Sequence, residues 1–258
     1  MNSPLVSTDR RVARPRLVIV PGLHGSGAEH WQSWLQHQVD GAVRVEQDDW
    51  SAPDLDRWSE RVAATLASLG PGPHVVVAHS FGCLATLHAL HRRPRLGIGP
   101  LLLVAPAEPA RFDVAHLLPQ TRLTQDSCLV ASDTDPWMTA TSARAWALRW
   151  GSDWINLGDA GHVNVASGFG PFPLARDWTF AALRRLAPRS CIVASDNDPW
   201  MSASQAHAWA LRWGSDWINL GNAGHINVDS GYGPFPLARE WAAGALNRLD
   251  LRPWRHAA

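Results

Sequence analysis

The stretch Val75-Val76-Val77-Ala78-His79-Ser80-Phe81-Gly82 joins a run of β-branched residues to a serine in a tight, small-residue turn. The run predicts a buried strand, and the leucines at 84, 87 and 90 predict a helix after the turn. A serine placed between a strand and a helix in this way projects its hydroxyl above the sheet. We therefore expect Ser80 to be a nucleophile, although a serine that only caps the helix would give a similar pattern.

Apolar runs and amphipathic helical patterns alternate on both sides of this stretch. Strands are predicted at 17–20, 43–45, 75–77, 101–104, 128–131 and 154–157. A helix with a single apolar stripe is predicted at 55–69, with Asp54 as its N-terminal cap. This alternation is typical of a parallel sheet covered by helices on both faces. We expect an α/β fold of three layers, with residues 108–126 as a connecting segment or lid.

Residues 127–186 recur as residues 190–249, and about three-quarters of the paired positions are identical. We therefore expect an α/β domain at 1–187 and, at 188–258, a duplicated copy of its last β-α-β-α segment. Tryptophans at helical spacing, Trp146 and Trp150 with their repeats Trp209 and Trp213, are interpreted as core residues.

Each copy contains an Asp-Pro-Trp after one predicted strand and a Gly-His after the next. The first copy thus offers Asp135 and His162, and the second Asp198 and His225, whereas Ser80 occurs once. Both residues of a pair would lie at the carboxyl edge of the sheet, where such folds bind ligands. The order serine, acid, histidine is that of α/β-hydrolases, in which the imidazole activates the serine and the carboxylate orients the imidazole. Asp133 is a rival for the acid.

Two backbone N–H groups are candidates for binding the oxyanion of an acyl-transfer intermediate. One belongs to Phe81, and the other belongs to the glycine-rich loop after the first strand, where we favour Leu23. That loop does not match the spacing of a phosphate-binding loop, and no lysine exists to reach a phosphate. The histidines show no metal-ligand spacing, and we interpret His74 and His88 as surface or boundary residues. We expect neither a metal nor a cofactor.

The composition limits the partners. The chain has 23 basic and 23 acidic residues, so its formal net charge is zero, which argues against nucleic acid or an anionic membrane as the main partner. Three cysteines are too few for a disulfide framework, and the polar N-terminal stretch lacks the apolar core of a signal peptide. No apolar segment is long enough to span a membrane. A cytoplasmic protein acting on a small molecule is expected.

Several stretches together resemble one family, the small serine hydrolases related to retinoblastoma-binding protein 9 in their bacterial form. They are Pro21-Gly22-Leu23, His30-Trp31-Gln32-Ser33-Trp34, Gln47-Asp48-Asp49-Trp50, Ala78-His79-Ser80-Phe81-Gly82, Gly161-His162-Val163-Asn164 and Gly168-Phe169-Gly170-Pro171. The resemblance covers about residues 16–186. It implies a compact α/β-hydrolase without a large cap domain, with Ser80 as nucleophile, Asp135 as acid and His162 as base.

The second copy departs from this family and leaves open which pair serves Ser80. Loops moved by two strands would shift by roughly 10 Å, too far for a second pair to reach the same serine. The first copy is the simpler occupant because its linker is shorter. The second copy could extend the sheet, pack as an appendage, replace the first, or serve a neighbouring chain by swapping.

Two functional hypotheses follow. The first is a serine hydrolase that cleaves a small ester, thioester or amide through an acyl-enzyme. The second is a non-catalytic interaction protein on a hydrolase scaffold, in which the duplicated segment docks or swaps to form a homo-oligomer.

Overall fold

The computed structural model describes residues 15–186, 190–213 and 215–249. These residues fall into two compact units, one extending to Leu183 and the other beginning at Arg184. None of the helices within these ranges is both long enough and apolar enough to cross a bilayer.

The first unit is built on a six-stranded sheet in which every neighbouring pair is parallel, in the order β2-β1-β3-β4-β5-β6. Its strands are β1 (Leu17–Val20), β2 (Val43–Arg44), β3 (His74–His79), β4 (Ile98–Val104), β5 (Ser127–Ala131) and β6 (Asp153–Asn156). The central strands β1, β3, β4 and β5 are buried along their whole lengths, as expected for apolar strands with both faces covered.

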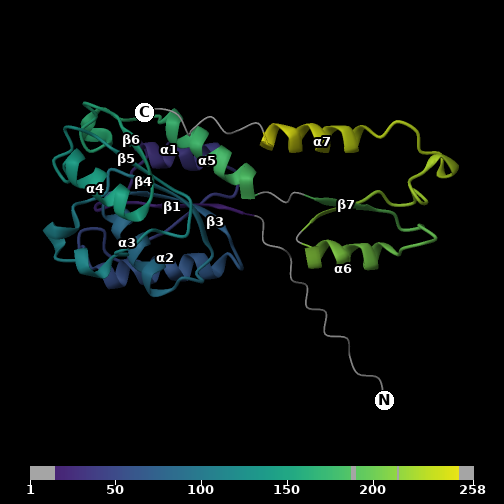
Figure 1. Ribbon diagram of the computed structural model, residues 1–258, viewed down its shortest axis with the longest axis horizontal. Helices are drawn as coiled ribbons and strands as arrows, with labels where there is room; N and C mark the ends of the chain where they lie inside the picture. The colour runs from purple at the N-terminus through teal and green to yellow at the C-terminus, as the bar shows by residue number, and fades with distance from the viewer. Residues whose placement is uncertain (1–14, 187–189, 214, 250–258) are drawn as a thin grey trace, which may run out of the picture. The chain divides into compact units, whose positions relative to one another are not determined.

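Helices cover this sheet on both faces. They are α1 (Trp31–Gln38), α2 (Leu55–Ser68), α3 (Phe81–Arg92), α4 (Ala140–Trp150) and α5 (Pro173–Leu186). Figure 1 shows α2 and α3 on one face of the sheet and α1 and α5 on the other. Asp54 begins α2 by accepting a hydrogen bond from the N–H of Arg57, which is the expected cap. The predicted three-layer α/β class is confirmed.

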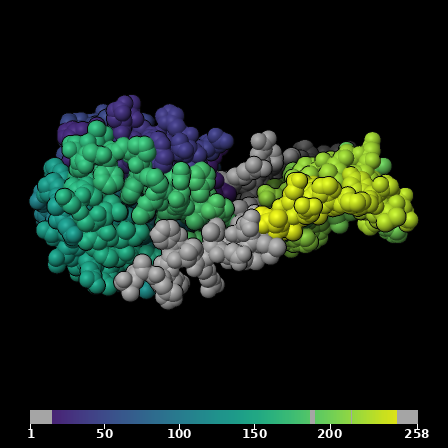
Figure 2. All heavy atoms as spheres, turned by 90° about the horizontal axis from the view of Figure 1, so that it is seen from above, coloured from purple at the N-terminus to yellow at the C-terminus, as the bar shows by residue number. Residues whose placement is uncertain are grey.

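The face that carries α1 and α5 brings distant parts of the chain together. Figure 2 shows this face, where the purple atoms of the N-terminal part lie beside the green atoms that lead into α5. Trp31 of α1 packs edge-on against Phe172, with ring centroids 5.4 Å apart. Its indole N–H donates a 2.8 Å hydrogen bond to the carbonyl of Val163. Both contacts fix the segment after β6 against the first helix.

Residues 108–126, expected to form a connecting segment or lid, contain two short 3₁₀ turns. These are η1 (Pro109–Phe112) and η2 (Ala115–Leu117). The expectation for two histidines was wrong, because His74 and His88 are buried. Nδ1 of His74 accepts the N–H of Arg16, and its Nε2 lies 3.4 Å from the carbonyl oxygen of Gly70. His88 bonds the carbonyl of Leu117 and the carboxylate of Asp56.

The second unit contains β7 (Cys191–Ala194), α6 (Ala203–Trp213), β8 (Asp216–Asn219), η4 (Val228–Ser230) and α7 (Pro236–Leu249). Strands β7 and β8 form a parallel two-stranded sheet of their own and do not extend the six-stranded sheet. Trp146 and Trp150 in α4 are buried as expected, but the corresponding Trp209 and Trp213 in α6 are exposed. The expectation that these tryptophans are core residues is therefore confirmed for the first copy and wrong for the second.

Candidate active site

Ser80 lies at the end of β3, where the chain turns sharply into α3. Its backbone has a φ of +54°, a left-handed value that is strained for a residue with a side chain. Its N–H is held by the carbonyl of Val104 at the end of β4. The Ser80 side chain makes no capping bond to α3, so the simple N-cap interpretation does not describe it. Instead, the hydroxyl lies 2.8 Å from Nε2 of His162.

Two glycines make room for this turn. A Cβ on Gly22 would lie 2.7 Å from the Cβ of Ser80, and a Cβ on Gly82 would collide with the carbonyl oxygens of Val20 and Pro21. Only hydrogen atoms fit at these positions. The loop after β1 can therefore approach the serine directly, because both residues lack a side chain.

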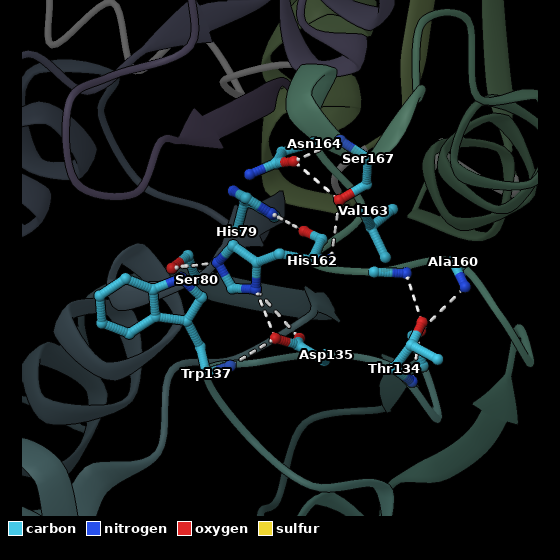
Figure 3. Close-up of polar contacts among 12 residues, drawn as sticks. His79, Ser80, Thr134, Asp135, Trp137, Ala160, His162, Val163, Asn164 and Ser167 are labelled. Atoms are coloured by element: carbon cyan, nitrogen blue, oxygen red, sulfur yellow. Dashed lines mark hydrogen bonds and ion pairs between the residues drawn. The ribbon is translucent and has the colours of Figure 1, made fainter.

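Asp135 and His162 reach Ser80 from the loops that follow β5 and β6. The ring Nδ1 of His162 lies 2.9 Å and 3.0 Å from the two carboxylate oxygens of Asp135, and Oδ1 also accepts a bond from the N–H of Trp137 (Figure 3). The Asp135 and His162 side chains are only 2% and 8% exposed. Asp133, the rival, instead accepts a bond from the Asn156 amide.

The backbone of His162 is held on both sides. Its N–H donates to Oγ of Ser167, which in turn donates to Oδ1 of Asn164. Its carbonyl lies 3.0 Å from Nε2 of His79, and because a carbonyl only accepts, that nitrogen must carry the proton and donate (Figure 3). Gly161, with a φ of +53°, allows the turn that precedes the histidine.

Two further imidazoles lie beside this arrangement and are kept neutral. Burial lowers the pKa of His30 to about 4, with further lowering from Arg44 and His162. Burial also holds the pKa of His79 well below its ordinary value, with repulsion from His162 and His30 adding to the effect. Nδ1 of His30 accepts the N–H of Gln32 at the start of α1, so this ring also serves as a helix cap.

A cavity of about 300 Å³ opens beside Ser80, and Leu23 lies in its wall. Of the two predicted oxyanion donors, Leu23 belongs to the loop after β1 and Phe81 is the first residue of α3. The first N–H groups of a helix have no partner within the helix, so the N–H of Phe81 is available at the positive end of α3. Among the backbone bonds of the described loops and turns, neither N–H is a donor.

The family model for serine hydrolases matches residues 17–181, and matches a second time over residues 177–242. A solved structure from Pectobacterium atrosepticum, described as a YdeN-like hydrolase, is 36% identical, with a TM-score of 0.64 over 69% of this chain and 95% of that chain.

The chain belongs to the serine hydrolase family.

Other solved structures share the fold of this serine hydrolase. The ydeN gene product of Bacillus subtilis is 20% identical, with a TM-score of 0.55 over 65% of this chain and 98% of that chain. An α/β hydrolase from Agrobacterium tumefaciens is 18% identical, with a TM-score of 0.50 over 67% of this chain and 86% of that chain. No curated protein gave a match to the sequence. The family and the fold therefore agree that this is a serine hydrolase enzyme with an α/β-hydrolase fold.

The corresponding Asp–His pair of the second copy is also formed. Nδ1 of His225 lies 3.0 Å from Oδ2 of Asp198, and the N–H of Trp200 donates to the same carboxylate. The hydrogen bond from Trp200 is the main cause of a lowered pKa at Asp198, and the bond to His225 lowers that pKa further. The Asp198 and His225 side chains are 13% and 49% exposed, however. No hydroxyl bonds Nε2 of His225 among the described residues, so the pair found at Ser80 is that of the first copy.

Some residues of the hydrolase's site have no strong sequence signal. Phe112 lines the cavity from a connecting segment without periodicity, while Val165 and Ala166 lie in a 3₁₀ turn after the histidine. Trp137 could have been suspected because it follows Asp135 by two positions. Within the described ranges, no group of three or more His, Cys, Asp or Glu side chains is placed to hold a metal ion.

Proposed function

We propose that this enzyme cleaves a small ester, thioester or amide through an acyl-enzyme, with Ser80 as nucleophile, His162 as base and Asp135 as the acid that orients it. One observation carries the proposal. A continuous set of hydrogen bonds runs from the Ser80 hydroxyl through both ring nitrogens of His162 to the Asp135 carboxylate. All three side chains are buried, so water competes little for these bonds.

Acylation begins when Oγ of Ser80 attacks the substrate carbonyl carbon while Nε2 of His162 takes the hydroxyl proton. The carbonyl oxygen becomes an oxyanion, which accepts hydrogen bonds from the N–H groups of Leu23 and Phe81. As the tetrahedral intermediate collapses, the bond to the leaving group breaks and His162 donates its proton to that group. The acyl group remains on Ser80 as an ester.

Deacylation repeats these steps with water. His162 removes a proton from a water molecule as the water oxygen attacks the acyl carbon. The bond to Oγ of Ser80 then breaks, and His162 returns the proton to the serine. Throughout the cycle, Asp135 accepts a hydrogen bond from Nδ1 of His162, which keeps Nε2 free as the base and stabilises the imidazolium.

A fluorophosphonate probe tests the nucleophile, since it phosphonylates activated serines. The wild-type protein should be labelled, and Ser80→Ala should not. His162→Ala should also lose labelling, whereas His225→Ala, the matched change in the second copy, should keep it. Equal labelling of wild type and Ser80→Ala would reject the assignment, and loss of labelling in His225→Ala alone would transfer the base to the second copy.

The finer family placement and the domain division are parts of the same proposal. The shared motifs around Gly22, Trp31 and Ser80 favour the subgroup related to retinoblastoma-binding protein 9. We take residues 1–187 as the hydrolase domain and residues 188–258 as an added copy of its last segment. The zero net charge favours a small-molecule substrate over nucleic acid or a membrane, and the low cysteine content favours the cytoplasm.

The other hypothesis, a non-catalytic interaction protein, predicts no labelling of Ser80 and no ester turnover. Family membership and the hydrogen-bonded serine favour the enzyme. The two ideas conflict only over Ser80, because an active hydrolase could also self-associate through its second unit.

A further inference from the structure

The wall of the cavity beside Ser80 contains no Asp, Glu, Lys or Arg side chain. Its apolar part comes from four separate segments and consists of Leu23, Ala107, Phe112, Trp137, Val165 and Ala166. Its polar part consists of Ser80, Asn164 and four histidines. Asn164 uses its side-chain oxygen to bind the N–H and hydroxyl of Ser167, so that oxygen is already engaged.

Two buried histidines of this wall, His30 and His79, add no charge near neutral pH. The pKa of His30 is lowered to about 4 and that of His79 lies well below its usual value, in both cases mainly because the rings are buried. Asp135 does not line the cavity, because its carboxylate is bonded to His162 and to the N–H of Trp137. Arg111 stacks on the ring of Trp137, 5.6 Å from its centroid, and is also outside the wall.

The size of the cavity limits the substrate further. A volume of about 300 Å³ corresponds to roughly ten water molecules, and therefore to roughly ten non-hydrogen atoms. Phe112 bounds it on one side and packs against Phe81, with ring centroids 4.9 Å apart. Trp137 bounds it near the base, 6.0 Å from the ring of His162. Both rings are held by neighbours, so the cavity is largely preformed.

We infer that this cavity binds the acyl group of an uncharged carboxylic ester or thioester. The acyl group is apolar, contains up to roughly ten non-hydrogen atoms, and carries no carboxylate. This inference rests on the proposed acyl-enzyme function and specifies its substrate class. An anionic acyl group would lose its hydration in a wall with no lysine or arginine to pair with it, and burying an unpaired charge is costly.

The decisive comparison uses two p-nitrophenyl esters of nearly equal size, the 6-methylheptanoate and the monoester of adipic acid. They differ in that a terminal isopropyl group replaces a carboxylate. We expect kcat/KM to be at least about 100-fold lower for the adipate, because its charge enters an uncharged apolar site. In a linear series, kcat/KM should fall at least about tenfold from octanoate to dodecanoate, because the longer chain exceeds the cavity. The inference would be overturned by equal kcat/KM values for the 6-methylheptanoate and adipate esters, or by equal values for the octanoate and dodecanoate esters.

Val165 allows a gain-of-function test with a matched control. It is exposed at the cavity wall, and Val228 is the corresponding exposed residue of the second copy. Val165→Arg should raise kcat/KM for the adipate monoester about fivefold, as expected for one partly exposed ion pair. Val228→Arg should leave kcat/KM unchanged for both esters. Identical effects of the two substitutions would contradict the assignment of the cavity as the acyl site.

Failure of this inference differs from failure of the proposed function. If the fluorophosphonate labels Ser80 but the charged and uncharged esters are cleaved equally well, the acyl-enzyme mechanism stands and the substrate class is wrong. If Ser80 is not labelled and no ester is cleaved faster than by the Ser80→Ala protein, the proposed function fails and this inference fails with it.

Discussion

His79 donates a hydrogen bond from its ring Nε2 to the backbone carbonyl of His162, across 3.0 Å. The donor is the residue immediately before Ser80, the proposed nucleophile, and the acceptor belongs to His162, the proposed base. The His79 ring is buried between His30 and His162, with centroids 5.0 Å and 4.9 Å away. The strand that presents Ser80 is thereby tied directly to the loop that presents His162, and we infer that His79 is a positioning residue.

Removing this donor should slow the reaction without weakening substrate binding. We expect His79→Leu to lower kcat about tenfold with KM nearly unchanged, because the unpaired carbonyl costs about 1–3 kcal/mol and loosens the His162 loop. His79→Gln can still donate and should recover most of kcat. Steady-state kinetics on a p-nitrophenyl ester measures both values. A change confined to KM, or no recovery with glutamine, would count against a positioning role.

The acid should be required only in the first copy. Asp135→Asn should lower kcat about 10³–10⁴-fold, because an amide cannot hold His162 in the tautomer that leaves Nε2 unprotonated. Asp198→Asn makes the same change in the second unit and should leave kcat unchanged. Ester hydrolysis by the two purified variants checks this directly. Loss of ester hydrolysis in Asp198→Asn alone would mean that the Asp198–His225 pair serves Ser80 in solution.

The close approach of the loop after β1 should make Gly22 sensitive to substitution. Gly22→Ala places a methyl 2.7 Å from Cβ and 3.3 Å from Oγ of Ser80, so the serine or the loop must move. We expect a loss of kcat of at least about 100-fold, because small misplacements at a reacting centre are costly. Gly170→Ala, with no atom within 4 Å of the new methyl and a position outside the cavity wall, should retain activity in the same assay. Equal activity of the two variants would contradict this account.

Stability should fall as pH decreases from about 6.5 toward 4. His30 has a folded-state pKa of about 4, below that of the unfolded chain, and the pKa of His79 is lowered as well. In this window the unfolded state binds more protons, so protonation favours unfolding. Asp56, whose pKa is lowered from 3.8, titrates below the window.

Urea unfolding midpoints at pH 7.5 and pH 5.5 measure this effect. The difference between them should shrink in His30→Asn, which removes the imidazole, while the asparagine side chain can still cap α1. The other charged and titratable groups that face His30 are Arg44, His79 and His162, and they remain in the variant. If the midpoints differ as much in His30→Asn as in the wild type, His30 does not contribute to the loss of stability at low pH.

The second unit should promote self-association with another copy of this chain. Trp209 and Trp213 are 38% and 63% exposed, whereas the corresponding Trp146 and Trp150 are 9% and 0% exposed. The same face that is covered in the first copy is therefore open in the second, and a two-fold pairing of two such faces would bury it. Light scattering should detect a dimer that Trp209→Arg with Trp213→Arg abolishes. Leu148→Arg, at an exposed position of α4, should leave it intact. A monomeric wild type at all concentrations would contradict this prediction.

Most of the fold was predictable because local patterns and global structure agree. The strands and helices around Ser80 lie within a few residues of their expected bounds, and the Asp54 cap forms as its sequence predicts. The burial of His74 and His88 was not predictable, because each depends on partners brought from elsewhere, such as Leu117 for His88. The different burial of Trp150 and Trp213 was equally hidden, because their local sequences are the same.

The sequence by itself determined the class of the fold, the strained turn at Ser80 and a short set of acids and histidines that could serve it. Strand and helix periodicity and turn chemistry are local properties, so they can be read from neighbouring residues. Only the tertiary structure decided which of two nearly identical Asp–His pairs lies at Ser80, and it placed Asp135 and His162 there. That outcome depends on β5 pairing with β4 while β7 pairs with β8, and strand pairing is a long-range property that two similar segments share equally in sequence.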